Sequence, residues 1–172
     1  SDNGNLISDD LTIAGLTAAE NKFMDLTKAN GQPLVSGPDR LVVGTQDSVQ
    51  ADNLNNQQTV VSTTANSGFN NNPHADKYGK VATPYLSNTS LRQPDGTSFS
   101  NQDSDQWLLA ANPAVLAAVY IGFLDGRTVP YIETGDLSFD TLGMAWRGYF
   151  DFGVGAGDEE AAVLSLGDGS SV

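Results

Sequence analysis

The chain has 172 residues, no cysteine, and a net charge of −13 that arises from 21 acidic and 8 basic residues. The lack of cysteine excludes disulfides and thiolate metal sites. The excess of carboxylates argues against direct, sequence-specific binding to nucleic acid, because phosphate contacts need clustered lysine and arginine. Without an apolar run of about 18 residues, the sequence also predicts no membrane span.

The first helix is predicted over residues 12–28, where apolar side chains recur at three- and four-residue steps and form one stripe. It begins at Thr12 or, by capping-box spacing, at Thr17, and the pair Asn30-Gly31 ends it. The stripe consists of Leu16, Ala19, Phe23 and Leu26.

The rest of the first 110 residues predicts short elements that alternate with two polar loops. Residues 55–76 and 87–105 are rich in Asn, Gln, Ser and Thr, so we expect both to be exposed, and the first to be partly mobile. A second short helix is predicted at 47–54, and strands at 41–43, 80–86 and 106–110.

Residues 111–172 predict a hairpin, a long strand, a last short strand at 159–166 and a Gly/Ser tail. Asp125-Gly126 lies between apolar runs and is a strong hairpin signal, because the turn needs positive φ at both central residues. From Leu142 the sequence alternates with a period of two, which is typical of a half-buried strand. The residues that point one way are Leu142, Met144, Trp146, Gly148, Phe150 and Phe152. Because they are large and share this face, Trp146, Phe150 and Phe152 are predicted to be buried.

The sequence predicts no catalytic, cofactor-binding or metal-binding residue. His74 is the only histidine and lies in an Asn-rich loop, where a solvated side chain is expected. The run Asn101, Asp103, Asp105 lacks the glycine and the distal glutamate of a calcium loop. The glycine-rich residues 153–157 follow a strand, but no lysine or helix pattern comes next, as a phosphate loop would need.

Four residues are candidates for contacts between subunits: Glu133, Arg147, Tyr149 and Asp151. Arg147 shares a strand face with Tyr149 and Asp151, and it can pair with Asp151 or with Glu133 on the neighbouring strand. One interpretation is an exposed ion pair that adds little stability. The other is an interface contact, because Arg and Tyr are enriched among residues that dominate binding energy.

Residues 112–154 include LDGRTVPYIE and FDTLGMAWRGYFDFGV, and they resemble the carboxy-terminal part of tailed-phage major capsid proteins. The resemblance is to the Mu-like prophage major head subunit and to heads fused to a ClpP-type prohead protease. Residues 11–44, 72–87 and 105–109 are similar to earlier parts of that family in the same order. The family's amino-terminal arm, extended loop and spine helix have no counterpart before Leu11. The resemblance therefore implies the carboxy-terminal half of a head protein.

The fold class predicted by this resemblance is α+β, with the phage major capsid fold of the Hong Kong ninety-seven type. Residues 1–110, with their two polar loops, would form most of the axial domain, a mixed sheet with helices. Residues 111–172 would supply the antiparallel strands of the peripheral domain.

The function implied is that of a structural, non-enzymatic subunit of an icosahedral phage or prophage head, without cofactors. Such a subunit self-assembles in the host cytoplasm and resides in the virion. Its partners would be copies of itself, in pentamers and hexamers, with a portal, a scaffold or a prohead protease as further candidates. Two alternatives remain open: an encapsulin-like compartment shell, and an acidic extracellular binding or hydrolytic domain rich in β-structure.

Overall fold

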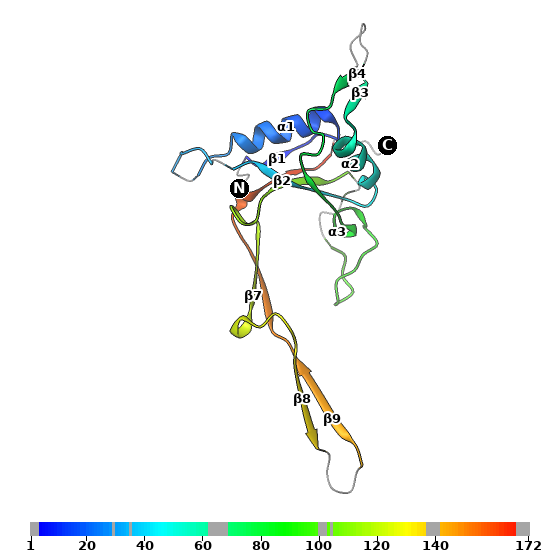
Figure 1. Ribbon diagram of the computed structural model, residues 1–172, viewed down its shortest axis with the longest axis vertical. Helices are drawn as coiled ribbons and strands as arrows, with labels where there is room; N and C mark the ends of the chain where they lie inside the picture. The colour runs from blue at the N-terminus through cyan, green and yellow to red at the C-terminus, as the bar shows by residue number, and fades with distance from the viewer. Residues whose placement is uncertain are drawn as a thin grey trace. The chain divides into compact units, whose positions relative to one another are not determined.

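The computed structural model describes residues 4–28, 30–34, 36–61, 69–99, 103, 105–136 and 142–167. The chain divides into two units, which are described separately (Figure 1). The first unit comprises Ser1–Ala118 and Asp158–Val172, and the second comprises Val119–Gly157. The mixture of helices and several sheets makes the fold α+β, as predicted.

The first unit is built on a five-stranded mixed sheet within the described residues, in the order β1-β11-β6-β2-β5. The β1–β11 and β2–β5 pairs are parallel, whereas β6 is antiparallel to both of its neighbours. The strands are β1 (Leu6–Ile7), β2 (Pro38–Val43), β5 (Gly79–Ala82), β6 (Trp107–Ala111) and β11 (Ala162–Ser165).

Two helices contribute to the core of this unit: α1 (Ile13–Met24), which Figure 1 shows lying across the sheet, and α2 (Ser48–Asn56). The helix α1 begins after Thr12, whose side chain accepts a hydrogen bond from the Gly15 N–H at 3.1 Å, so the earlier of the two predicted starts is confirmed. The predicted extension to residue 28 is wrong, because the chain turns at residue 25 and Thr27 forms a β-bridge with Pro33.

The core lies between the helices and one face of the sheet. Strand alternation turns Trp107, Leu109 and Ala111 of β6 inward, and each is buried. They meet the predicted apolar stripe, all of which is buried, although its last member, Leu26, lies after the end of α1. The core cluster also contains Leu41, Val43, Ala51, Leu54, Tyr78 and Val163.

The two polar loops contain more structure than predicted. In the first, β3 (Thr59–Val61) pairs with β4 (Phe69–Asn71), while residues 62–68 lie outside the described part of the chain. The strand predicted at 80–86 ends early, because Thr83 caps the short helix α3 (Pro84–Ser87), which has proline in its first turn. In the second loop, Arg92 forms a β-bridge with Ser98 around the predicted turn, where Gly96 has a φ of +85°.

The second unit consists of two antiparallel pairs within the described residues: β7 (Val119–Phe123) with β10 (Phe152–Ala156), and β8 (Tyr131–Asp136) with β9 (Met144–Tyr149). We call Val119–Gly157 the ribbon. Asp125 and Gly126 adopt the predicted positive φ, 54° and 68°. They lie in the 3-10 turn η1 (Leu124–Gly126), and the strands on either side do not pair with each other. The hairpin predicted at this point is therefore wrong.

The predicted long strand is interrupted between β9 and β10. Its parity is confirmed where β9 pairs with β8, because Met144, Trp146 and Gly148 share a face. The predicted burial is wrong: the Trp146 side chain is 67% exposed, and Phe150 and Phe152 are exposed as well. The last predicted strand becomes the 3-10 turn η2 (Glu159–Ala161) followed by β11. No helix in the described residues is long and apolar enough to cross a membrane.

Candidate functional site

The β8–β9 pair of the ribbon has two chemically different faces. Register pairs Tyr131 with Tyr149 and Glu133 with Arg147 on one face, and Ile132 with Gly148 on the other. Because side chains alternate along each strand, the two faces differ in composition. The first carries both tyrosines and the Glu133–Arg147 pair, and the second carries three large apolar side chains together with Thr134 and Asp136. The two faces can therefore make different contacts.

The polar face holds an ion pair in which the Arg147 Nε–H donates to a Glu133 carboxylate oxygen. This hydrogen bond and the charge of Glu133 raise the pKa of the Arg147 guanidinium. The Tyr131 and Tyr149 rings lie 5.1 Å apart between centroids, and the Arg127 guanidinium lies 4.9 Å from the centroid of the Tyr131 ring. The ion pair and the tyrosine pair each link β8 to β9, whereas Arg127 contacts Tyr131 from the turn before β8.

The opposite face, which we call the apolar face of β8–β9, carries the exposed side chains of Ile132, Met144 and Trp146. Thr134 lies across from Trp146 and Asp136 across from Met144 on the same face. Gly148 lies directly across from Ile132 and adds no side chain to this face. Apolar side chains that cluster on one uncovered face are typical of a contact surface. The apolar face of β8–β9 is therefore the first candidate for binding a partner.

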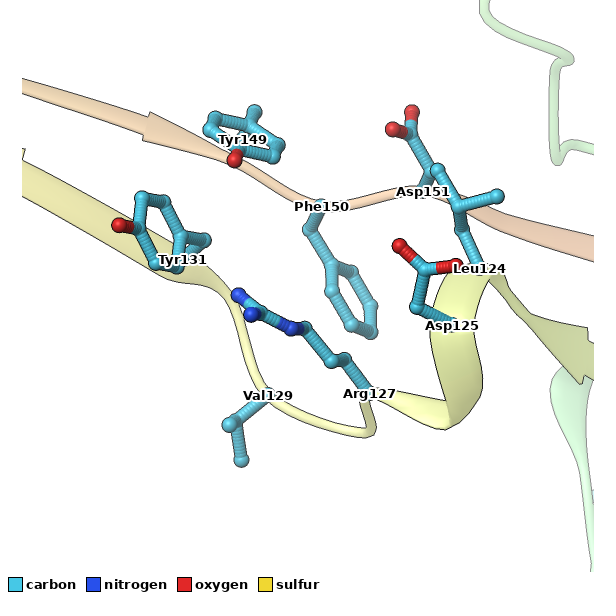
Figure 2. Close-up of a pocket in the computed structure, with 8 residues that line it drawn as sticks. All are labelled: Leu124, Asp125, Arg127, Val129, Tyr131, Tyr149, Phe150 and Asp151. Carbon is cyan, nitrogen blue, oxygen red and sulfur yellow. The ribbon is translucent and has the colours of Figure 1, made fainter.

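A cavity of about 180 Å³ lies where β8–β9 meets the turn that contains η1 (Figure 2). Figure 2 shows the Arg127 side chain reaching from the turn toward Tyr131. Asp125, Tyr149, Phe150 and Asp151 also contribute to its lining. Aromatic rings, one guanidinium and carboxylates thus surround a space that accommodates a side chain rather than a cofactor.

The β7–β10 pair of the ribbon contains no charged residue in either strand. The register places the side chains of Val119, Ile121, Phe123, Phe152, Val154 and Ala156 on one face. The opposite face contains Tyr120 and the three glycines Gly122, Gly153 and Gly155. A two-stranded sheet is marginally stable on its own, so this part of the ribbon has the physical character of a surface that a partner covers.

A buried polar cluster in the first unit was not predicted. His74 is 2% exposed, and its ring nitrogens lie 3.0 Å from Thr17 Oγ1 and 3.2 Å from the Tyr78 hydroxyl. Glu20, buried on α1, lies 3.7 Å from His74 Nδ1 and forms an ion pair with Lys77. The solvated loop histidine predicted from the sequence is therefore wrong.

Burial dominates the electrostatics of this cluster. It lowers the pKa of His74, against the opposing effect of the Glu20 charge, and together with Glu20 it raises the pKa of Tyr78. Both ring nitrogens of His74 face hydroxyl groups, so the neutral imidazole is satisfied where it lies. The cluster joins α1 to the segment before β5, which is a structural role.

A second cavity, of about 420 Å³, is lined in part by Asp10, Asp47 and Asp105. Burial and the charges of Asp105 and Asp10 raise the pKa of the Asp47 carboxyl. Among the described residues, no group of three or more His, Asp or Glu side chains is arranged to hold a metal ion. Asn101, which belongs to the run compared above with a calcium loop, lies outside the described part of the chain.

The structure brings the predicted contact residues together on the ribbon. Glu133, Arg147 and Tyr149 share the polar face of β8–β9, and Asp151 lines the adjoining cavity with Tyr149. Arg147 pairs with Glu133, one of its two predicted partners. Sequence reasoning missed the apolar face of β7, although its run of uncharged residues before Asp125 was a usable signal.

Comparison with known proteins gives one family. Residues 1–165 match the family model described as phage capsid protein. No curated protein and no solved structure matches the chain.

Proposed function

The chain belongs to the phage capsid protein family, and we propose that it acts by self-assembly, with the ribbon Val119–Gly157 as a contact between copies. Membership of this family makes it a structural protein of the phage head. Finer features stay part of the proposal: an icosahedral shell built from pentamers and hexamers, a fold of the Hong Kong ninety-seven type, and kinship with Mu-like or protease-fused heads.

The observation that carries the contact role is the contrast between the two units. The first unit buries a core of large apolar side chains, whereas the ribbon leaves Ile121, Trp146, Phe152 and others exposed. Burial of apolar area is the main driving force for association between proteins. A shell subunit that is built from many repeated contacts needs such surfaces, and a monomeric protein does not.

The polar face of β8–β9 supplies the specificity in this account. Glu133 and Arg147 are fixed by their mutual ion pair, and Arg and Tyr are the residue types that most often dominate binding energy. The apolar face would supply affinity, and the charged face would set orientation. The net charge of −13 opposes association at low salt, so assembly is expected to strengthen as salt screens the repulsion.

Assembly of the purified protein tests this function. We expect light scattering and electron microscopy to show a monomer or a small ring in dilute buffer, and a shift toward larger particles as salt rises. Trp146→Asp would remove the tryptophan ring from the apolar face of β8–β9, add a second carboxylate beside that of Asp136, and abolish the particles. The matched control is Val49→Asp on α2, because Val49 is 70% exposed but lies in the first unit. Equal loss in both variants, or particles that survive Trp146→Asp, would contradict the role of the ribbon.

The family match favours the phage head over the encapsulin-like shell and the extracellular domain. The virion is then the site of the protein, and assembly in the host cytoplasm stays a proposal. A portal, a scaffold and a prohead protease remain predicted partners, to be sought by co-purification with assembling particles. A catalytic role is not proposed, because the family is structural.

A further inference from the structure

We propose that β7 of one copy pairs edge to edge with β7 of a second copy, in an antiparallel arrangement centred on Ile121. This inference rests on the proposed function and names the strand that joins two copies. The resulting four-stranded sheet would have the order β10-β7-β7-β10 across a two-fold axis. The partner is thus a second copy of this chain, bound by main-chain hydrogen bonds.

The edge of β7 that faces away from β10 is open. Within the described residues, β7 pairs only with β10, and its other edge has no strand partner. The Leu124 N–H donates to the Asp151 carbonyl at 3.2 Å, on the side of β10. Because N–H groups alternate sides along a strand, those of Tyr120 and Gly122 face β10, and those of Val119, Ile121 and Phe123 face the open edge.

No proline or charged residue of β7 protects this edge. Natural proteins protect open edges with proline or charged residues, since unpaired main-chain groups otherwise recruit further strands. The sequence VYIGF of β7 contains neither. In contrast, β8 follows Pro130 and carries Glu133 and Asp136. The open edge of β7 is therefore available for pairing, whereas that of β8 is protected.

The strand β7 is also complementary to a second copy of itself. Antiparallel pairing centred on Ile121 places Tyr120 opposite Gly122 of the second copy, and Val119 opposite its Phe123. A Cβ at Gly122 would meet no atom within 4 Å, so a tyrosine ring has room to cover this glycine. An aromatic side chain across from a glycine is a favourable pair at a sheet edge. The apolar face continues without a break across the junction.

The same test applied to β10 gives a poorer pairing. An antiparallel arrangement centred on Val154 places Gly153 opposite Gly155, which leaves that face without side chains to pack. The β7 edge is therefore the better of the two open edges.

Charge identifies a second copy as the occupant. Each copy carries −13, so two copies approach most easily along a surface without carboxylates. No charged residue lies between Asp105 and Asp125, a stretch that includes all of β7. A two-fold arrangement uses the same strand on both sides, as isologous contacts between identical subunits do.

Disulfide cross-linking tests the pairing. Because the chain contains no cysteine, any disulfide must form through the introduced residue. Residues that face each other across a hydrogen-bonded antiparallel pair have Cα atoms about 5.5 Å apart, which is within the range of a disulfide. Under the conditions that assemble the wild type, Ile121→Cys should give a covalent dimer as the main species on a non-reducing gel. Val154→Cys reports on the competing edge, and Val49→Cys is a matched control; their side chains are 63% and 70% exposed, against 58% for Ile121.

The outcomes separate this inference from the proposed function. A dimer with Ile121→Cys alone supports β7 pairing. Equal cross-linking of all three variants, or of Val154→Cys alone, overturns it. Particles that form without an Ile121→Cys cross-link overturn the pairing and leave the capsid function standing. A cross-linked dimer without particles leaves the pairing standing and contradicts self-assembly.

A second variant avoids dependence on oxidation chemistry. Ile121→Lys places a charge on the open edge, as natural edge strands do, and should remove the pairing. Because the side chain is exposed, the midpoint of urea unfolding should not change. Val49→Lys is the control for added charge. Particles that form equally well with Ile121→Lys and with Val49→Lys would overturn the inference.

Discussion

The chain has two tryptophans, and the account assigns them opposite roles that truncation can distinguish. Trp107 is fully buried in β6 between the sheet and the helices, and its Nε1–H donates to the Asp9 carbonyl at 3.0 Å. Trp146 lies on the uncovered face of the ribbon. Trp107→Ala should therefore damage the fold, and Trp146→Ala should damage only the contacts between copies.

The magnitude follows from burial. Replacing a buried Trp with Ala costs about 3–5 kcal/mol in free energy of unfolding, through lost transfer energy and the cavity left behind. The lost hydrogen bond adds little, because the Asp9 carbonyl also accepts from the Ser165 hydroxyl at 2.5 Å. Exposed substitutions typically stay within about 0.5 kcal/mol. We therefore expect Trp146→Ala to leave the stability of the unassembled protein unchanged.

Urea unfolding followed by circular dichroism measures both variants at a salt concentration where the protein is unassembled. Trp107→Phe serves as a control that keeps one aromatic ring but loses the rest of the indole and its N–H, and it should cost less than Trp107→Ala. A Trp146→Ala variant as unstable as Trp107→Ala would refute the reasoning, since it would show that the ribbon is covered within the single chain.

Three further predictions concern the first unit. Burial lowers the pKa of His74 from its usual 6.5, so the unfolded chain binds the proton more readily than the folded one. The free energy of unfolding should therefore fall as pH drops below about 6.5. His74→Gln should flatten this dependence in unfolding measured from pH 7 to 5. Burial and nearby charges raise the pKa of Asp47, so its charged form is disfavoured in the folded protein. Asp47→Asn should therefore raise the melting temperature at pH 7 and not below pH 3.8, and no gain at pH 7 would contradict this prediction. Thr12→Ala removes the cap of α1 and should cost about 1 kcal/mol by urea unfolding, whereas Thr12→Ser should cost much less.

The first helix and the central strands were predictable because their signals are local. The apolar stripe of α1 faces the core as its spacing indicates, and β6 lies within one residue of the predicted strand. The cap at Thr12 could also be identified from residue type and position. In these elements local preference and tertiary packing agree, so the sequence alone sufficed.

The ribbon shows where local signals stop being sufficient. Asp125 and Gly126 have the positive φ that their residue types favour, but whether the flanking strands pair depends on residues far away. β7 joins β10 instead, about thirty residues further along the chain. Strand parity placed Trp146 on an apolar face correctly, yet periodicity cannot say whether the chain itself covers that face.

His74 was mispredicted for a related reason. Its neighbours in sequence are polar, which favours an exposed loop, but Thr17 and Glu20 come from α1 and bury it. Such a contact spans more than fifty residues and leaves no mark in the local composition. The candidate contact residues Glu133 and Arg147 were easier to predict, because cross-strand pairing within a hairpin-like segment is nearly local.

The central claim is that copies of this capsid protein meet through the ribbon, and hydrogen–deuterium exchange tests it most directly. Amide exchange is compared between unassembled and assembled protein at the same pH. We predict that β7–β10 and β8–β9 gain protection on assembly, most strongly at Val119, Ile121 and Phe123, whose N–H groups face the open edge. Exchange that stays fast throughout Val119–Gly157 in assembled particles, with new protection confined to the first unit, would contradict the account.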